Sequence, residues 1–244
     1  MKEGMFVTRK KYNHDIIFRI VSIDGNVCKL RGEFVRLLAD AEIDDLEEIS
    51  MKEIQVEVKD EEVRGNNDIV KGTVLHIDGD GYYLNKCLAA YKANKIPAIG
   101  IHLEEDRIKD NITDLLVTYN PDILVITGHD RYNKDKDEYD NSSAFIEAVK
   151  KARVYQPNKD SLIIFAGACQ SYYEGIIESG ANFASSINRV NINVLDPSFI
   201  AIQVANSKVE EYIDVKKILS NTISKGRGLG GIDTKGVARK IYIG

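Results

Sequence analysis

Two side chains that can act as a nucleophile and as a proton carrier follow two apolar segments of the sequence in the same way. His129 follows the segment 122–127 in D-I-L-V-I-T-G-H-D, and Cys169 follows the segment 162–166 in L-I-I-F-A-G-A-C. A cysteine thiolate attacks carbonyl carbons, and a histidine beside it activates the thiol and carries its proton. If the two segments are neighbouring strands, the imidazole and the thiol face each other at one edge of a sheet. The two residues are therefore a candidate catalytic pair.

The order of the histidines along the chain limits the catalytic scheme. All of them stand before Cys169: His14, His76, His102 and His129. Papain-like peptidases and glutaminase-type α/β enzymes need a histidine after the nucleophile, so neither scheme can be built on Cys169. Caspase-like peptidases have the histidine roughly 50 residues before the cysteine, and from 129 to 169 the separation is 40. The order favours a caspase-like pair.

The other two cysteines fit structural roles. Cys28, Cys87 and Cys169 are an odd number without a C-x-x-C pair, which argues against a disulfide framework and against a structural zinc site. Cys87 lies on the apolar stripe of an expected helix and Cys28 in a short strand, where a cysteine behaves as a small apolar residue. Cys169 lies just past a strand instead, and a helix starting soon after it would favour the thiolate. We expect no metal and no cofactor.

From residue 69 onward the pattern indicates strands that alternate with helices. Four segments are nearly continuous in apolarity, as expected for strands covered on both faces: 74–77, 96–101, 122–127 and 162–166. Helical apolar stripes lie between them, for example Ile108, Ile112, Leu115, Leu116 and Tyr119. The alternation predicts an α/β fold, a three-layer sandwich with a mostly parallel sheet and helices on both faces. In such sheets chemistry occurs at the carboxyl ends of the strands, where His129 and Cys169 are expected.

The N-terminal part of the chain has a different pattern of apolar and turn residues. Short β-rich segments separated by turn signals such as D-G-N at 24–26 predict a small SH3-like β-barrel module over residues 1–45. Residues 46–68 are acidic and predict a linker, with a short helix at the start of this acidic region. The α/β domain then covers residues 69–244. Near its end, the glycine-rich segment 226–231 predicts a mobile loop.

Composition and charge narrow the classes of partner. The chain of 244 residues has 43% hydrophobic and 29% charged residues and a formal net charge of −5, values that predict a globular protein and give no reason to expect nucleic acid as a partner. The N-terminal sequence M-K-E-G-M-F-V-T-R-K lacks the apolar core of a secretory signal, and no apolar segment is long enough to span a bilayer. We expect a cytoplasmic protein without membrane insertion.

Long blocks of the sequence resemble one family, the YabG sporulation-specific cysteine peptidases of spore-forming Firmicutes. In the N-terminal module the resemblance lies in V-T-R-K-K-Y-N-H-D-I-I-F-R-I and R-L-L-A-D-A. In the larger domain it lies in V-L-H-I-D-G-D, D-I-L-V-I-T-G-H-D, F-A-G-A-C-Q-S-Y-Y-E, G-A-N-F-A-S-S and G-G-I-D-T-K-G. The blocks extend over nearly the whole chain and are far more specific than the spacing of two residues.

The resemblance implies a peptidase with a caspase-like fold that works during spore formation. Its expected substrates are spore coat and coat-assembly proteins, cleaved after basic residues. Its expected location is the cytoplasm of the mother cell, with association with the forming coat as an open alternative. Arg64, in the acidic linker, would be accessible to cleavage, so self-processing between the two parts is a further hypothesis.

The residue after the histidine departs from the wider caspase-like group, which usually has glycine there. In this chain Asp130 follows His129, and the glycine precedes it as Gly128. A backbone N–H can bind an oxyanion whatever its side chain. We therefore expect the N–H groups of Asp130 and Cys169 to form the oxyanion hole.

Two acidic residues follow the first strand of the α/β domain, in H-I-D-G-D-G. Asp78 and Asp80 are candidates for an S1 pocket that pairs with the guanidinium of a P1 arginine, and Asp130 and Asp196 are further candidates. Asp and Gly are also common turn residues, so this segment can equally be a turn. The competing functional hypothesis is a non-catalytic, doubly wound, receiver-like domain that holds Mg²⁺ and phosphate at Asp78 and Asp80. The absence of a G-x-G-x-x-G loop after this strand weakens it.

Overall fold

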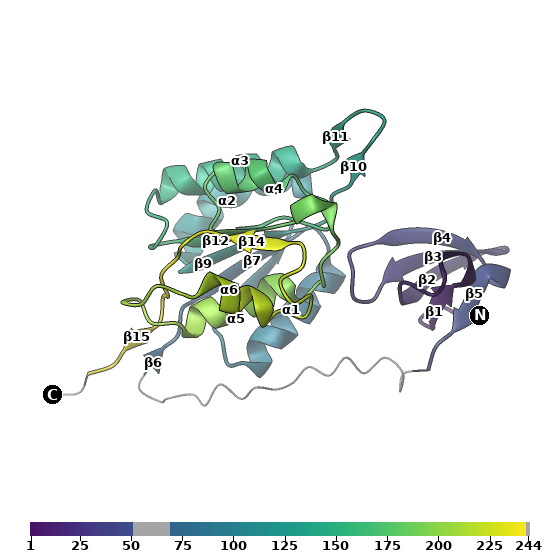
Figure 1. Ribbon diagram of the computed structural model, residues 1–244, viewed down its shortest axis with the longest axis horizontal. Coiled ribbons are helices and arrows are strands. Elements are labelled where there is room, and N and C mark those ends of the chain that lie inside the picture. The colour runs from purple at the N-terminus through teal and green to yellow at the C-terminus, as the bar shows by residue number, and fades with distance from the viewer. Residues whose placement is uncertain (51–68, 243–244) are drawn as a thin grey trace. The chain divides into compact units, whose positions relative to one another are not determined.

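Figure 1 shows the computed structural model of the chain, which describes residues 1–50 and 69–242. The chain divides into two compact units, Met1–Glu61 and Glu62–Gly244. Most of the expected acidic linker, 46–68, falls outside the described residues, and so does Arg64, the expected site of self-processing.

Short antiparallel strands form the sheet of the first unit, in the order β4-β3-β2-β1-β5. Their bounds are β1 (Phe6–Arg9), β2 (Phe18–Asp24), β3 (Val27–Gly32), β4 (Leu38–Glu42) and β5 (Leu46–Glu48), with the short helices η1 (Lys10–Tyr12) and η2 (Ile43–Asp45). The expected turn joins β2 to β3, and its Gly25 has a φ of 58°, which glycine adopts without steric cost. The N-terminal module is thus an antiparallel sheet, and its closure as an SH3-like barrel stays a prediction.

The first unit extends past the boundary expected at residue 45. Leu46–Glu48 form β5 and pair with β1, so they belong to the sheet and not to a linker. Leu46 is buried in the same core cluster as Val7, Phe18 and Leu30, which explains why the chain stays in the sheet. The short helix expected near this place is η2, a 3-10 helix of 3 residues.

The main sheet of the second unit has the strand order β14-β13-β12-β9-β7-β8 among its described residues. The bounds are β7 (Val74–Asp78), β8 (Ala98–His102), β9 (Ile123–Thr127), β12 (Ile163–Ala166), β13 (Phe183–Ser185) and β14 (Leu229–Gly231). All neighbouring strands are parallel except β13 and β14, which are antiparallel. Two short pairs lie outside this sheet: β10 (Tyr132–Asn133) with β11 (Glu138–Tyr139), and β6 (Ile69–Val70) with β15 (Arg239–Lys240).

Helices cover both faces of the main sheet. They are α1 (Gly81–Ala93), α2 (Glu105–Tyr119), α3 (Ser142–Tyr155), α4 (Tyr173–Glu178), α5 (Asp196–Asn206) and α6 (Val215–Ser220), with a 3-10 turn, η3 (Ile187–Arg189), after β13. In Figure 1, α2, α3 and α4 lie on one face and α1, α5 and α6 on the other. The expected mixed α/β fold with a mostly parallel sheet is confirmed, and the more specific caspase-like topology stays a prediction.

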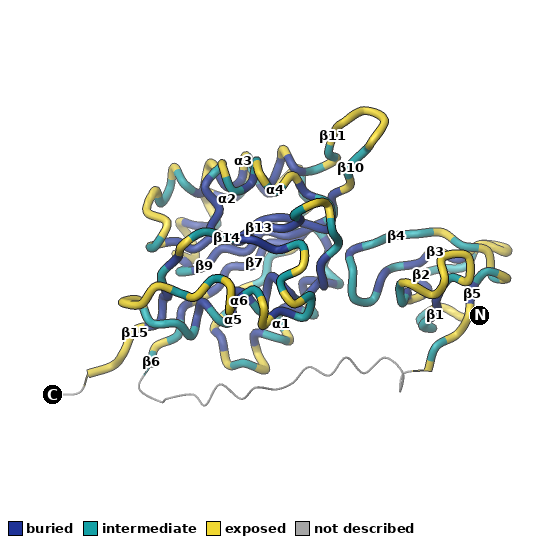
Figure 2. Tube along the Cα trace, in the orientation of Figure 1, coloured by how far each residue is buried: buried dark blue, intermediate teal, exposed yellow. Residues whose placement is uncertain are grey.

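The core lies on both faces of this sheet because alternate residues of a strand point to opposite sides. In β9, Ile123 and Val125 belong to the cluster that includes Tyr91 of α1 and Ile200 of α5. The alternate residues Leu124 and Ile126 belong to the cluster on the other face of the sheet, with residues of α2 and α3. Figure 2 shows the strands of the sheet as the buried centre of this unit. Burial on both faces explains why these segments are apolar throughout.

The glycine-rich segment near the C-terminus is part of the sheet and not only the mobile loop expected from its composition. Leu229–Gly231 form β14 at the edge beside β13. A Cβ at Gly230 would lie 2.3 Å from the Tyr173 hydroxyl oxygen, and one at Gly231 would lie 2.5 Å from the ring of Phe183. These glycines therefore serve close packing, which composition alone does not distinguish from flexibility. In the part of the chain that is described, no helix is long and apolar enough to cross a membrane.

Candidate active site

His129 and Cys169 follow two strands that are hydrogen-bonded neighbours. β9 and β12 are parallel, and Ile126 is paired with Ala166. His129 lies three residues after Ile126, and Cys169 lies three residues after Ala166. The structure therefore places both residues in loops at the carboxyl edge of the sheet, each after one of two adjacent strands.

The segment between β12 and Cys169 is held in a defined path. Gly167 has a φ of 129°, and a Cβ at this position would lie 2.6 Å from the backbone oxygen of Ser185. The Ser185 hydroxyl donates to the Ala168 carbonyl at 2.9 Å, and the Ala168 N–H donates to the Ser171 hydroxyl at 2.8 Å. These contacts fix the peptide that precedes Cys169, whose own exposure is only 4%. The helix expected soon after the cysteine is α4.

The His129 ring lies between two carboxylates from two different helices. Its Nδ1 is 3.5 Å from Oε1 of Glu105, at the start of α2, and its Nε2 is 3.7 Å from Oδ2 of Asp80, the N-cap residue of α1. Glu105 also accepts a hydrogen bond from the His129 backbone N–H. The Tyr83 ring lies 6.0 Å from the imidazole, centroid to centroid. The site thus has a histidine with acidic groups on both ring nitrogens.

Glu105 is stabilised as a carboxylate. Burial raises the pKa of its carboxyl group, but hydrogen bonds from the His129 side chain, the His129 N–H and the Glu105 N–H outweigh burial and leave the pKa below its ordinary value. This residue was missed in the sequence. It lies just past the carboxyl end of β8, so the same rule that pointed to His129 and Cys169 also covers it.

Asp130 organises the backbone around the site. Its carboxylate accepts from the N–H groups of Arg131 at 3.0 Å and Asn141 at 2.7 Å, and from the hydroxyl of Ser142. Burial raises the pKa of the Asp130 carboxyl despite these hydrogen bonds, which favour its charged form. Among the described residues no hydrogen bond uses the Asp130 backbone N–H. That N–H remains a candidate oxyanion donor, as does the N–H of Cys169.

The two acidic residues after the first strand of this unit occupy different environments. Asp78 is fully buried, and its carboxylate accepts from the Thr127 hydroxyl and the Asp80 N–H, at 2.8 and 2.9 Å. The side chain of Asp80 is 10% exposed. Its Oδ1 accepts a hydrogen bond from the Tyr82 N–H, and its Oδ2 lies 3.7 Å from Nε2 of His129. Asp78 is therefore part of the interior, which conflicts with an S1 role, and Asp80 is the residue of the pair that faces the site.

The last acidic candidate is also interior. Asp196 is fully buried and accepts from the N–H groups of Asn193 and Ser224, at 2.9 and 3.2 Å. Its carboxylate fixes the loop before α5, and this use leaves it unsuited to contact a substrate side chain. The receiver-like hypothesis is weakened for the same reason. A cation would need the carboxylate oxygens of Asp78 as ligands, but these oxygens already accept hydrogen bonds from protein groups.

An aromatic hairpin adjoins the two loops of the site. The β10–β11 hairpin follows the histidine loop, and the Tyr132 N–H donates to the Gln170 side chain at 3.2 Å, directly after Cys169. Arg189 lies 3.7 Å above the Tyr132 ring, and the Tyr139 ring stacks on Tyr172 at 5.6 Å. Residues from three separate segments thus form one wall beside the carboxyl edge of the sheet.

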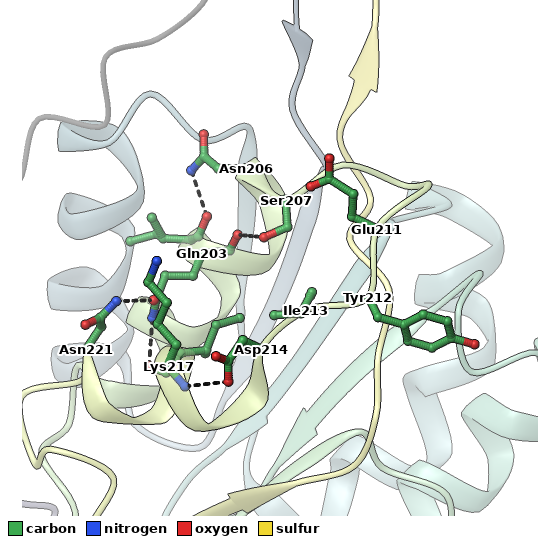
Figure 3. Close-up of a pocket in the computed structure, with 11 residues that line it drawn as sticks. Gln203, Asn206, Ser207, Glu211, Tyr212, Ile213, Asp214, Lys217 and Asn221 are labelled. Carbon is green, nitrogen blue, oxygen red and sulfur yellow. Dashed lines mark hydrogen bonds between the residues drawn. The ribbon is translucent and has the colours of Figure 1, made fainter.

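A separate pocket of about 340 Å³ lies between α5, α6 and the segment 207–214. Figure 3 shows Gln203, Asn221, Lys217 and Asp214 around it, with Asn221 and Gln203 joined by a hydrogen bond of 3.1 Å. None of the residues expected at the active site lines this pocket. It is therefore distinct from the His129 and Cys169 edge.

Comparison of the whole chain with known families gives its class. The chain matches the family described as YabG peptidase U57 over residues 2–71 and 57–242, so it belongs to this peptidase family. Among curated relatives, the sporulation-specific protease YabG of Bacillus subtilis (strain 168) is 40% identical over 277 aligned positions, which cover 97% of this chain and 96% of the relative. The family expected from the sequence blocks is confirmed.

Proposed function

We propose that this peptidase is a cysteine endopeptidase in which Cys169 is the nucleophile and His129 the general acid and base. The observation that carries the proposal is the matched position of the two residues in the loops after the paired strands β9 and β12. It is supported by the fixed path of the backbone before Cys169. The strand order also favours His129, because β9 adjoins β12 whereas β8, which ends at His102, does not. A catalytic pair needs this kind of juxtaposition on rigid elements.

The reaction proceeds through an acyl-enzyme. The Cys169 thiolate attacks the scissile carbonyl, the C–N bond breaks, and protonated His129 gives its proton to the leaving amine. A water molecule then loses a proton to His129 and attacks the thioester, which releases the acid and restores the thiolate. The N–H groups of Asp130 and Cys169 stabilise the oxyanion, and one such donor contributes about 3 kcal/mol in other enzymes.

The proposed substrates are proteins of the spore coat and of its assembly, cleaved after basic residues in the mother cell. The name of the relative from Bacillus subtilis, a sporulation-specific protease, supports a role in sporulation. Asp80 is the proposed S1 carboxylate, because it faces the histidine from the first strand end whereas Asp78 is interior. A carboxylate in this place pairs with the guanidinium of arginine.

The nucleophile is tested by replacement with a matched control. Cys169→Ala is expected to abolish cleavage of a coat-protein substrate, and Cys87→Ala, which removes a buried thiol of α1, is expected to retain it. Retained cleavage by Cys169→Ala would refute the proposal.

The S1 assignment is tested with peptides that differ only at P1. Asn also caps helices, so Asp80→Asn keeps an acceptor for the Tyr82 N–H while removing the charge. We expect kcat/KM for P1 arginine to fall about 10- to 100-fold relative to a neutral P1, the range for loss of a charged hydrogen bond. An unchanged P1 preference excludes Asp80 from S1.

A further inference from the structure

We propose that Glu105 is the positioning residue of this site: it holds the His129 ring by Nδ1 and leaves Nε2 for the exchange of protons with thiol and substrate. The inference rests on the proposed function, since it assigns a role beside the His129 and Cys169 pair. Glu105 contacts His129 at the ring and at the backbone N–H, so its proposed effect passes through the imidazole.

The first observation is that the Glu105 carboxylate contacts His129 at two places, the backbone N–H and the ring. Oε1 of Glu105 accepts the His129 backbone N–H and lies 3.5 Å from Nδ1 of the same residue. Contacts to backbone and ring together restrict both the loop after β9 and the rotation of the imidazole. Catalytic hydrogen bonds are often long before substrate binds and tighten in the complex, so 3.5 Å fits a contact that closes during the reaction.

The second observation is a space kept open for this carboxylate. A Cβ at Gly79 would lie 2.1 Å from Oε1 of Glu105, and a Cβ at Gly128 would lie 2.6 Å from it. The glycines come from two different strand ends, after β7 and after β9, and Glu105 comes from a third, after β8. The glycines beside Asp78 and His129 are therefore explained by the need of Glu105 to reach the histidine, which goes beyond a turn preference.

The third observation concerns the other ring nitrogen. The Nε2 of His129 is buried and has no hydrogen-bond partner among the described residues, although Asp80 lies 3.7 Å from it. The groups that contact the ring are the Asp80 carboxylate at the N-cap of α1, the Tyr83 ring of α1 and the Glu105 carboxylate of α2. Cys169 lies in the loop after the neighbouring strand β12. With Glu105 at Nδ1, the neutral imidazole keeps its proton there and presents the lone pair of Nε2. Nε2 is then the atom that takes a proton from the thiol and gives it to the leaving amine.

The tautomer of His129 tests this role without any need for activity. In the full-length Cys169→Ala protein with ¹⁵N-labelled histidine, the ring ¹⁵N shifts at alkaline pH report which nitrogen holds the proton. We expect His129 to be protonated at Nδ1, and this population to fall in Glu105→Ala but not in Glu104→Ala, which removes the exposed neighbouring carboxylate. Identical His129 shifts in the Glu105→Ala and unaltered proteins would overturn the inference.

Kinetics separate this inference from the proposed function. Glu105→Gln, which keeps the volume of the side chain, is expected to lower kcat about 100-fold with KM within about twofold, as for loss of an orienting group behind a catalytic histidine. Gly128→Ala is expected to do the same by displacing the carboxylate, while Glu104→Gln stays at full activity. If Cys169→Ala is inactive and both Glu105→Gln and Gly128→Ala are fully active, only the role of Glu105 fails. If Cys169→Ala is active, the proposed nucleophile fails.

Discussion

His129 and Cys169 follow two hydrogen-bonded parallel strands, each three residues past one of the paired positions Ile126 and Ala166. The strands are buried on both faces, so the two loops start from a rigid base. Small changes in the loops should therefore alter catalysis more than they alter the fold of the sheet.

Gly167→Ala should inactivate the peptidase. The φ of 129° is unfavourable for alanine, and the new Cβ would collide with the Ser185 backbone oxygen, so the backbone before Cys169 must move at a cost of about 1–3 kcal/mol. Gly25→Ala is the matched control, because Gly25 also has a positive φ but no atom within 4 Å of its Cβ position. Peptide cleavage is the measurement, and normal activity of Gly167→Ala contradicts the prediction.

Glu105→Gln should reduce stability at neutral pH and lose this effect in acid. The folded-state pKa of Glu105 lies below its ordinary value of 4.5, so the ionised carboxylate adds stability that is present above 4.5 and is lost as pH falls through the lowered pKa. The difference in free energy of unfolding between the two proteins should therefore shrink on acidification. Urea unfolding at several pH values measures it, with Glu104→Gln as control. A difference that grows toward low pH contradicts this sign.

Ser142→Ala should weaken the loop that presents the Asp130 N–H. The hydroxyl donates to the Asp130 carboxylate and accepts the Tyr172 N–H at 2.8 Å, so it joins the histidine loop to the segment after Cys169. Loss of a hydrogen bond to a buried carboxylate costs about 1–3 kcal/mol. Because this bond favours the charged form, the loss of stability should be larger above the raised pKa of Asp130 than below it.

The exposed neighbour Ser143 gives the control for that change. Ser143→Ala should leave both thermal unfolding and kcat close to those of the unaltered protein. Equal stability of Ser142→Ala and Ser143→Ala across the pH range would show that the link to Asp130 contributes nothing.

Arg153→Met should destabilise the second unit. The guanidinium donates to the carbonyls of Gly180 and Leu162, at 2.8 and 2.9 Å, and to the Asn182 side chain at 2.7 Å, so it ties the end of α3 to the start of β12. Burial lowers the pKa of Arg153 to about 10, which still leaves it charged at neutral pH. Leaving these acceptors without their donor costs about 2–4 kcal/mol.

Thermal unfolding measures that loss, and Lys150→Met, at an exposed position of the same helix, is the control. A melting temperature of Arg153→Met equal to that of Lys150→Met would mean that the guanidinium contacts do not hold β12.

The main sheet was predictable because its strands are buried on both faces. The segments expected at 122–127 and 162–166 are β9 and β12 within one residue at each end. The expected start at Ile96 differs from that of β8 at Ala98, where Pro97 intervenes. β14 was not expected, because two of its three residues are glycines that make room for Tyr173 and Phe183. A contact between residues distant in the chain leaves no local signal.

The placement of the candidate residues was predictable from the strands before them, but the burial of their side chains was not. The positions of His129 and Cys169 after two neighbouring strands were expected from the apolar segments that precede them. Asp78 and Asp80 look alike in the sequence, since both stand beside a glycine at the end of a strand. Only the fold shows that Asp78 is buried and bound by the Thr127 hydroxyl. Glu105 was missed because its partner is 24 residues away and nothing local distinguishes it from Glu104 and Asp106.

The rate at which iodoacetamide alkylates Cys169 tests the central pairing most directly. In the unaltered protein at neutral pH, mass spectrometry should find Cys169 modified well before Cys28 and Cys87. In His129→Ala, loss of the imidazole partner should slow this reaction about tenfold or more, because the thiolate is then no longer stabilised. A rate at Cys169 that is the same with and without His129 would contradict the catalytic pair.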